Sequence, residues 1–258
     1  MSQKMSQHID ALDAMKKYPS ELFYKGELSL LDRPKVAIVG TRRPSTYTRQ
    51  FTHILAQSLA KRGVCIVSGA AMGVDTIAHN GAGAENTIAV MANGLDIHYP
   101  VHNSNMIKNI EKHGLTLSQF NDGFRAMSWS FVVRNELVVA LGDILIVTEA
   151  DLNSGSMRSV EYALKMGKEI FVLSQRIDES LGTNSLLHTG KASVISDIES
   201  FVSRYGEEAC EKMEKDEFFY FCQSLPTFDD TVKKFGDRVY EAELEGFVTI
   251  HNGIVRLS

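Results

Sequence analysis

The chain has 258 residues, of which 44% are hydrophobic and 23% are charged, a composition typical of a globular protein and unlike a disordered or fibrous one. Three widely spaced cysteines argue against a disulfide framework, and no apolar run reaches the roughly 20 residues of a membrane span, so we expect a cytoplasmic protein with reduced thiols and no membrane contact. The formal net charge is −5, but residues 207–258 carry 6 Lys and Arg against 12 Asp and Glu; residues 1–206 are therefore nearly neutral, which excludes a broad basic face as a site for polyanions.

The chain begins with a polar segment, residues 1–30, in which Ile9, Leu12 and Met15 predict a short amphipathic helix. We expect this segment to be an N-terminal helical extension. The apolar, β-branched run 35–39 that follows predicts a strand buried on both faces. It ends at Gly40, and a helix is predicted over 48–62, with Gly63 closing it.

The same alternation of strand, loop and helix continues along the chain. Repeated βα units of this kind indicate an α/β protein with a doubly wound, mostly parallel, Rossmann-like sheet over residues 31–206. The predicted strands are 64–67, 87–91, 115–118, 144–147 and 169–173, and the predicted helices are one through Ala78, then 103–113, 130–141 and 156–166.

A change in composition near Gly206 predicts a second, smaller domain at 207–258. Helical runs at 218–223, 228–235 and 237–244 precede two apolar runs, 247–250 and 254–257. The Asn252-Gly253 pair between these runs is a strong hairpin signal. Three small helices and a hairpin predict a winged-helix-like C-terminal domain.

The first of the functional loops is Gly40 to Ser45, at the carboxyl end of the first predicted strand, where open parallel sheets bind ligands. It combines a glycine with the Thr41 and Ser45 hydroxyls and the guanidinium groups of Arg42 and Arg43. Backbone N–H groups, a helix dipole and bidentate arginines are the usual ligands of phosphate. The competing interpretation is that both arginines are ordinary surface charges.

Two further loops have the small residues of an anion site. Residues 68–75 hold two glycines but match neither a dinucleotide fingerprint nor a Walker sequence, and Asp75 is equally well explained as a helix cap. Residues 154–157 place Ser154, Gly155 and Ser156 at a helix start, where they cap the helix, bind an anion, or do both.

Aromatic rings lie beside a guanidinium in the segment from Trp129 to Asn135. Such a combination stacks bases and holds phosphate. For Trp129 we favour core packing, whereas for Phe131 core packing and base stacking are equally supported.

No catalytic constellation is recognised in the sequence. The eight histidines are scattered, and Pro100 between His98 and His102 prevents a helical pair of metal ligands. We therefore predict no enzymatic activity, no metal and no cofactor.

Six motifs in this order resemble the DprA/Smf family of DNA-processing proteins, over about residues 20–205: VAIVGTRRPS (36–45), SGAAMGVDTIAH (68–79), TIAVMANGLDIHYPVHN (87–103), FVVRNELVVAL (131–141), VTEADLNSGSM (147–157) and GTNSLLHTGKA (182–192). The resemblance implies an extended Rossmann domain that binds single-stranded DNA without enzymatic activity. It also implies a homodimer that assists RecA on incoming DNA during natural transformation. The additional N-terminal domain of longer relatives does not fit in about 30 residues, and we expect it to be missing.

The resemblance also implies roles for individual residues. Arg42 takes the main phosphate-binding role and Arg43 a supporting one. Two departures weaken this transfer: Met72 stands where many relatives have a basic residue, and residues 131–135 lack the family's proline. The predicted DNA-binding residues are Gly40, Thr41, Arg42, Arg43, Ser68, Gly69, Phe131, Arg134, Asn135, Ser154, Gly155 and Ser156.

The resulting hypothesis places phosphates of one strand on the amides of the Gly40, Gly69 and Gly155 loops, with Arg42 as the clamp and Phe131 stacking a base. One alternative is a nucleotide N-glycosidase, in which Glu161 would match the glutamate of that group's motif, although residues 154–161 have only one of its glycines and lack its proline. A second alternative is duplex binding by the C-terminal domain, which its acidity disfavours, so we expect a protein contact or a regulatory role there.

Overall fold

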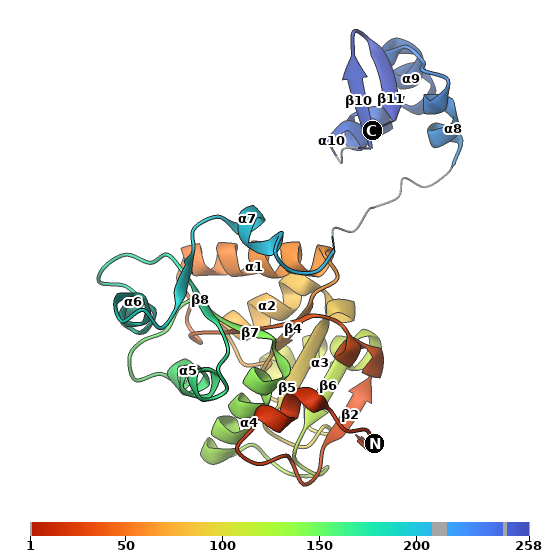
Figure 1. Ribbon diagram of the computed structural model, residues 1–258. Helices are drawn as coiled ribbons and strands as arrows, with labels where there is room; N and C mark the ends of the chain where they lie inside the picture. Colours follow the sequence, from red (N-terminus) through yellow and green to blue (C-terminus); the bar gives the residue numbers. More distant parts are fainter. Residues whose placement is uncertain (1, 208–215, 245–246, 258) are drawn as a thin grey trace. The chain divides into compact units, whose positions relative to one another are not determined.

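The structure, a computed structural model, describes residues 2–207, 216–244 and 247–257 (Figure 1). The chain divides into two compact units, Met1–Ala209 and Cys210–Ser258. Most of the acidic stretch at 207–217, where we expected the boundary, lies outside the described residues. Among the helices that are described, none combines the length and the apolar character needed to cross a membrane.

The first unit is built on a nine-stranded sheet. Strands β3 to β9 of this sheet pair in parallel with one another. Strand β2 pairs antiparallel with β6, and β1 pairs antiparallel with β2. This confirms the mostly parallel, doubly wound sheet. In spatial order the strands are β1 (Gln3–Lys4), β2 (Phe23–Gly26), β6 (Leu115–Ser118), β5 (Thr87–Met91), β4 (Cys65–Ser68), β3 (Lys35–Val39), β7 (Ile144–Val147), β8 (Ile170–Leu173) and β9 (Ser193–Ile195).

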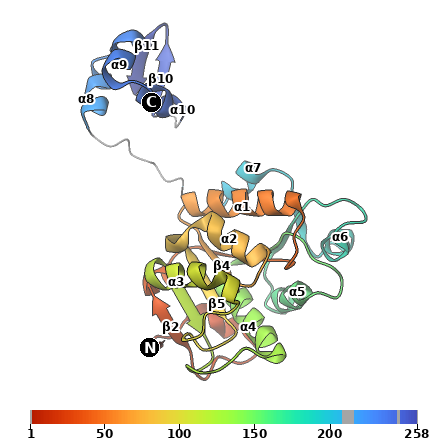
Figure 2. The same ribbon diagram turned by 180° about the vertical axis from the view of Figure 1, so that it is seen from behind.

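Helices cover both faces of this sheet. Val36 and Ile38 of β3 belong to a core on one face, and Ala37 and Val39 belong to the core on the other, which explains the uninterrupted apolar run of the strand. One face carries α1 (Thr46–Lys61), α2 (Val74–Ala82), α3 (Ser104–His113) and α7 (Ile198–Val202), and the opposite face carries α4 (Ser128–Leu141), α5 (Gly155–Lys165) and α6 (Leu181–His188) (Figures 1 and 2).

The described residues 2–30 contribute strands β1 and β2 to the sheet and do not form the helical extension that we expected. Strand β2 pairs with β6 and satisfies its open edge. Ile9, Leu12 and Met15 flank or lie within a 3₁₀ turn, η1 (Asp10–Ala14), and are buried in the core beneath α4. The remaining 3₁₀ turns are η2 (Leu28–Asp32), η3 (Ala84–Asn86) and η4 (Val101–Asn103).

The second unit contains the three helices and the hairpin that the sequence predicts. These are α8 (Glu217–Gln223), α9 (Phe228–Phe235), α10 (Arg238–Leu244), β10 (Val248–His251) and β11 (Ile254–Leu257). His251 pairs with Ile254, and Asn252 and Gly253 between them have φ values of 51° and 72°. Two consecutive positive φ values define a type I′ turn, the turn that an Asn-Gly pair favours.

Two of the three cysteines lie within the described residues. Cys65 and Cys222 are buried and free, as expected of reduced thiols. Cys210 lies outside the described residues.

Candidate functional site

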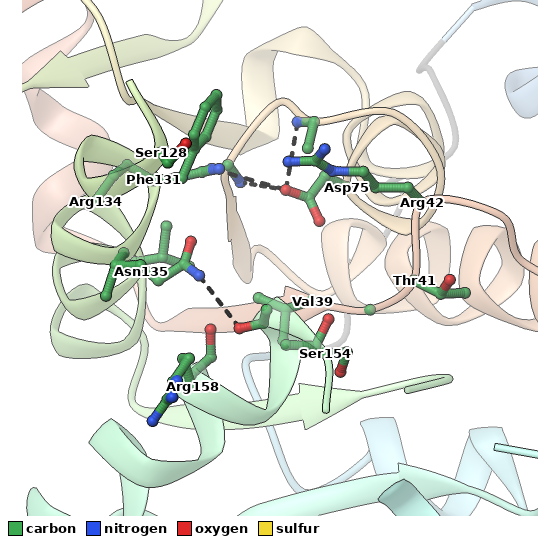
Figure 3. A pocket seen from close by; sticks show the side chains of 18 residues that line it. Val39, Thr41, Arg42, Asp75, Ser128, Phe131, Arg134, Asn135, Ser154 and Arg158 are labelled. Atoms are coloured by element: carbon green, nitrogen blue, oxygen red, sulfur yellow. Dashed lines mark hydrogen bonds and ion pairs between the residues drawn. The ribbon is translucent and has the colours of Figure 1, made fainter. Parts of the chain in front are cut away.

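A cavity of about 560 Å³ lies at the carboxyl end of β3, the strand that pairs with both β4 and β7. The connection after β3 runs through α1 on one face of the sheet, and the connection after its neighbour β7 runs through α5 on the other, so this is the topological switch point at which such sheets bind ligands. Ten of the twelve predicted residues line this switch-point pocket; Arg43 and Ser68 do not. Its lining comprises Val39, Gly40, Thr41, Arg42, Gly69, Ala71, Asp75, Ser128, Phe131, Val132, Arg134, Asn135, Val138, Ser154, Gly155, Ser156, Arg158 and Ser159 (Figure 3).

The first loop, Gly40 to Ser45, is held in place by Glu149, a residue that we did not single out from the sequence. The Thr41 N–H donates to the Glu149 carbonyl at 2.8 Å. The Ser45 N–H and hydroxyl both donate to the Glu149 carboxylate, at 3.0 and 2.9 Å, and the Ser45 hydroxyl in turn accepts from the Thr48 N–H at the start of α1. Glu149 thus fixes both ends of the loop.

Arg42 and Arg43 point in different directions. The Arg42 guanidinium lines the pocket and lies 5.6 Å from the centre of the Phe131 ring. Arg43 is exposed and outside the pocket, and its N–H donates to the Thr41 hydroxyl. Within the part of the chain that the structure describes, neither arginine forms an ion pair. Only Arg42 is therefore a free cation that faces the pocket.

In the second loop, residues 68–75, the backbone N–H groups of residues 69–71 are bonded inside the protein, whereas our hypothesis had the Gly69 amide binding a phosphate. The Gly69 and Ala71 N–H groups donate to the Asp75 carboxylate at 3.1 and 3.4 Å, and the Ala70 N–H donates to His79 Nε2. The Ser68 hydroxyl is buried and donates to the Ile38 carbonyl. Because these donors are already satisfied inside the protein, the Gly69 amide is not available to a phosphate.

Gly69 has a steric role, because its Cα lies against the guanidinium of Arg134. A Cβ at this position would lie 1.1 Å from Arg134 Nη1. Arg134 is 4% exposed, lies 3.8 Å from the Asp75 carboxylate and donates to the Val90 carbonyl at 3.3 Å (Figure 3). Arg134 thus forms an inner wall of the pocket.

Two cations and one buried carboxylate set the electrostatics of this wall. Burial lowers the pKa of Arg134, and the nearby positive charge of Arg42 lowers it further. The negative charge of Asp75 opposes this shift. Burial likewise raises the pKa of Asp75, against the opposing effects of Arg134 and the loop N–H groups. Since arginine keeps its proton in proteins, Arg42 and Arg134 give the pocket a local positive charge in a nearly neutral unit.

His79 is a buried, neutral support for the second loop. Burial, followed by the Arg134 charge, lowers its pKa to about 3. The Thr87 hydroxyl donates to the Ile66 carbonyl and therefore accepts from His79 Nδ1 at 2.6 Å. The proton thus lies on Nδ1, and Nε2 is left to accept from the Ala70 N–H.

The third loop leaves the start of α5 open. Gly155 and Ser156 are its first two residues, so their N–H groups have no acceptor within the helix. The Ser154 side chain forms no capping bond, and its hydroxyl is buried without a partner. Asn135 donates to the Gly155 carbonyl at 3.4 Å. This helix start is suited to bind an anion.

Arg158 also lines the pocket and was missed from the sequence. It lies one turn beyond Ser154 on α5, and that i to i+4 spacing was the signal that could have revealed it. Its guanidinium pairs with Glu161 at 2.9 Å on the exposed side of the helix. Glu161 is thus a surface partner of Arg158 and does not line the pocket.

Aromatic side chains continue beyond the mouth of the pocket. Phe131 packs against Tyr99, with ring centres 6.1 Å apart, and both border a small second cavity together with Arg42 and Met72. Our core interpretation of Trp129 is wrong: its side chain is half exposed, because the first turn of α4 lies at the surface.

The protein is similar over most of its length to known DNA-processing proteins. Residues 3–206 match the family described as DNA recombination-mediator protein A. The chain is 34% identical over 193 residues to Protein Smf of Synechocystis, covering 72% of this chain and 48% of that protein. It is 37% identical over 182 residues to DNA processing protein DprA of Streptococcus pneumoniae, covering 69% and 64%. The chain thus spans less than two thirds of each of these relatives.

Two solved structures share the fold. DNA processing protein A from Helicobacter pylori, whose structure concerns its binding of single-stranded DNA, superposes with a TM-score of 0.77 at 44% identity, over 79% of this chain and 95% of that one. The Streptococcus pneumoniae DprA structure gives 0.74 at 32% identity, over 79% and 74%. With the six ordered motifs and the match over residues 3–206, these similarities show that the chain belongs to the DNA recombination-mediator protein A family, the DprA/Smf proteins.

Proposed function

We propose that this protein binds single-stranded DNA in the switch-point pocket without reading its sequence. The observation that carries the proposal is the Arg42 guanidinium, which has no carboxylate partner among the described residues and faces the open start of α5 across one cavity. A phosphate between them would accept from the Gly155 and Ser156 N–H groups and from Arg42. Similarity to a relative that binds single-stranded DNA supports this ligand.

The bonded second loop changes the mechanism that we expected from the sequence. We infer that Gly69 and Arg134 shape the wall of the pocket, that buried Ser68 supports the loop behind it, and that Gly40, Thr41, Asn135 and Ser154 border the phosphate. The ring of Phe131, whose centre lies 5.6 Å from Arg42 Cζ, would stack a base. Contacts with phosphates and ring faces suit every base, which supports sequence-independent binding.

The test compares Arg42→Ala with Arg43→Ala, a matched removal of charge one residue away and outside the pocket. We expect Arg42→Ala to weaken binding of single-stranded DNA by about 10- to 100-fold, the value of a charged hydrogen bond. It should also reduce the salt slope by about 0.7 for each phosphate that the variant no longer neutralises. Arg43→Ala should have a smaller effect. Equal affinities of wild type and Arg42→Ala in a salt-series titration would disprove the clamp.

We also propose, on the family relationship, that the protein forms a homodimer and assists RecA in the cytoplasm during natural transformation. Competition between single- and double-stranded DNA of equal length tests the preference on which this role depends. Size-exclusion chromatography with light scattering tests the dimer. RecA filament assembly on coated DNA tests the loading role; no acceleration by wild type would contradict it.

We propose no enzymatic activity. Asp75 is the only carboxylate among the lining residues of the pocket, and it is buried and bonded to the second loop. Glu161, the residue that a nucleotide N-glycosidase would need, pairs with Arg158 instead. Release of free base from nucleoside monophosphates would contradict this proposal.

We propose that the acidic C-terminal unit contacts a protein or has a regulatory role, and does not bind a DNA backbone. Residues 207–258 hold 12 Asp and Glu against 6 Lys and Arg. Deletion of 208–258 should leave single-strand affinity within about threefold of the full chain, because every residue that lines the switch-point pocket belongs to the first unit. A collapse of binding in the shortened chain would refute this.

A further inference from the structure

We propose that three aromatic residues beside the pocket, Phe120, Phe124 and Trp129, form a second base-stacking surface for the same DNA strand. We call these three residues the aromatic cluster. The inference rests on the proposed function and adds to it a direction for the strand: out of the switch-point pocket, across the first turn of α4, and onto Trp129.

The geometry of the aromatic cluster gives Trp129 a fixed and accessible ring. Phe120 and Phe124 stack on each other, with ring centres 4.4 Å apart and planes at 11°. Both meet the Trp129 indole edge to face, at 5.6 and 5.7 Å. The two phenylalanines are only partly exposed, whereas Trp129 is 50% exposed. A braced indole with an open surface loses little side-chain entropy when a base stacks on it.

The aromatic cluster is continuous with the switch-point pocket along α4. Ser128, which lines the pocket, directly precedes Trp129, so their Cα atoms lie about 3.8 Å apart. Val132, three residues after Trp129 on the same side of the helix, also lines the pocket and is 41% exposed. Phe131, Val132 and Trp129 thus form an apolar path from the pocket to the cluster.

The local charge favours a nucleic-acid strand as the occupant. Arg125 follows Phe124 and is exposed, and it pairs with no carboxylate in the described part of the chain. The neighbouring Asp122 carboxylate already accepts from the N–H and hydroxyl of Ser2. A phosphate beside a stacked base would meet the exposed Arg125 guanidinium. The three rings, two from the segment before α4 and one from its first turn, also form a patch far smaller than the roughly 1,200 Å² of a stable protein interface.

Trp129 is the only tryptophan in the chain, so its fluorescence reports directly on this surface. The full chain is titrated with end-labelled oligothymidylates of about 4 and about 16 nucleotides, which span the usual site sizes. Label anisotropy measures binding, and indole emission measures stacking. We expect the longer strand to quench Trp129, and the shorter strand, held in the pocket, to leave the emission nearly unchanged.

Substitutions separate stacking from general effects. Trp129→Leu should weaken binding of the longer strand by about 5- to 100-fold, the value of one base stack, without changing the affinity for the shorter one. Trp129→Phe, which keeps an aromatic face, should restore most of the affinity. Tyr220→Leu, at an exposed aromatic of the other unit, is the matched control and should bind like wild type. Circular dichroism checks that each variant is folded.

The outcomes distinguish this inference from the proposed function. If the longer strand binds through Arg42 but neither quenches Trp129 nor responds to Trp129→Leu, the second surface is disproved and the pocket stands. If Trp129 emission changes with protein concentration in the absence of DNA, the cluster contacts a second copy and the inference is wrong. If neither strand binds, the proposed function fails and the inference fails with it.

Discussion

Substitution of Gly69 by alanine tests how the second loop is built. The new Cβ would lie 1.1 Å from Nη1 and 2.1 Å from Cζ of Arg134. The backbone of Gly69 is in a conformation open to alanine, because its φ is not among the positive values. The effect of the substitution is therefore expected to come from the overlap with the guanidinium.

The cost follows from the interactions that Arg134 would have to give up. A displaced guanidinium leaves its 3.8 Å partner Asp75 as a buried carboxylate and breaks the hydrogen bond to the Val90 carbonyl. Breaking a buried ion pair costs about 3–5 kcal/mol, and overpacking a core costs about 1–3 kcal/mol. Partial movement of the arginine relieves some of the overlap. We expect the free energy of unfolding of the first unit to fall by about 2–4 kcal/mol.

Thermal unfolding followed by Trp129 emission measures this change, since the single tryptophan reports on the first unit alone. For about 200 residues the destabilisation corresponds to a Tm lower by roughly 5–15 °C. The control is Gly155→Ala, because a Cβ there meets nothing within 4 Å and alanine favours a helix start. If the two variants unfold within about 0.5 kcal/mol of each other, Gly69 is not required by Arg134 and the reasoning is wrong.

Three further predictions concern residues that support the site. Burial lowers the pKa of His79 to about 3, so between pH 6.5 and 3 the unfolded chain binds a proton that the folded chain does not. The free energy of unfolding should therefore decrease as the pH is lowered through this range, by up to about 1.4 kcal/mol per pH unit. Denaturant titrations at several pH values should show a shallower slope for His79→Gln, and parallel slopes would contradict the assignment. Glu149→Ala removes the acceptor of two Ser45 hydrogen bonds, so it should lower stability by about 1–3 kcal/mol and weaken single-strand binding; wild-type affinity in an anisotropy titration would refute the anchor. Lys168→Met removes a partly buried ammonium that donates to the Ala140 and Gly142 carbonyls at the end of α4, and a destabilisation of about 1–2 kcal/mol is expected by thermal unfolding, with DNA affinity as the property that should not change.

The central strands were predictable because they are buried on both faces. Strands such as Lys35–Val39 and Thr87–Met91 appear in the sequence as short apolar runs with the bounds that the structure shows. Strand β2, Phe23–Gly26, was missed because only its first residue is buried and its sequence resembles a loop. Helix α6, Leu181–His188, was missed because its apolar residues are too few to set a helical period.

The composition of the site was predictable, but the direction of its polar groups was not. Loops after parallel strands converge at one edge of a sheet, so residues from 40, 69 and 155 were expected to meet. Whether the Gly69 amide faces the pocket depends on Asp75 and His79, which turn inward from the next helix to bond the loop. Such tertiary choices leave no periodic signal in a single sequence.

The outermost strands of the nine-stranded sheet limit how copies of the protein can associate. Strand β1 at one edge has two residues and β9 at the other has three, so neither offers a long row of unpaired backbone groups. Short edges resist the edge-to-edge pairing that leads to aggregation and to sheets continued across a dimer. Copies gathered at high density on one DNA strand would then keep their nine-stranded sheets separate.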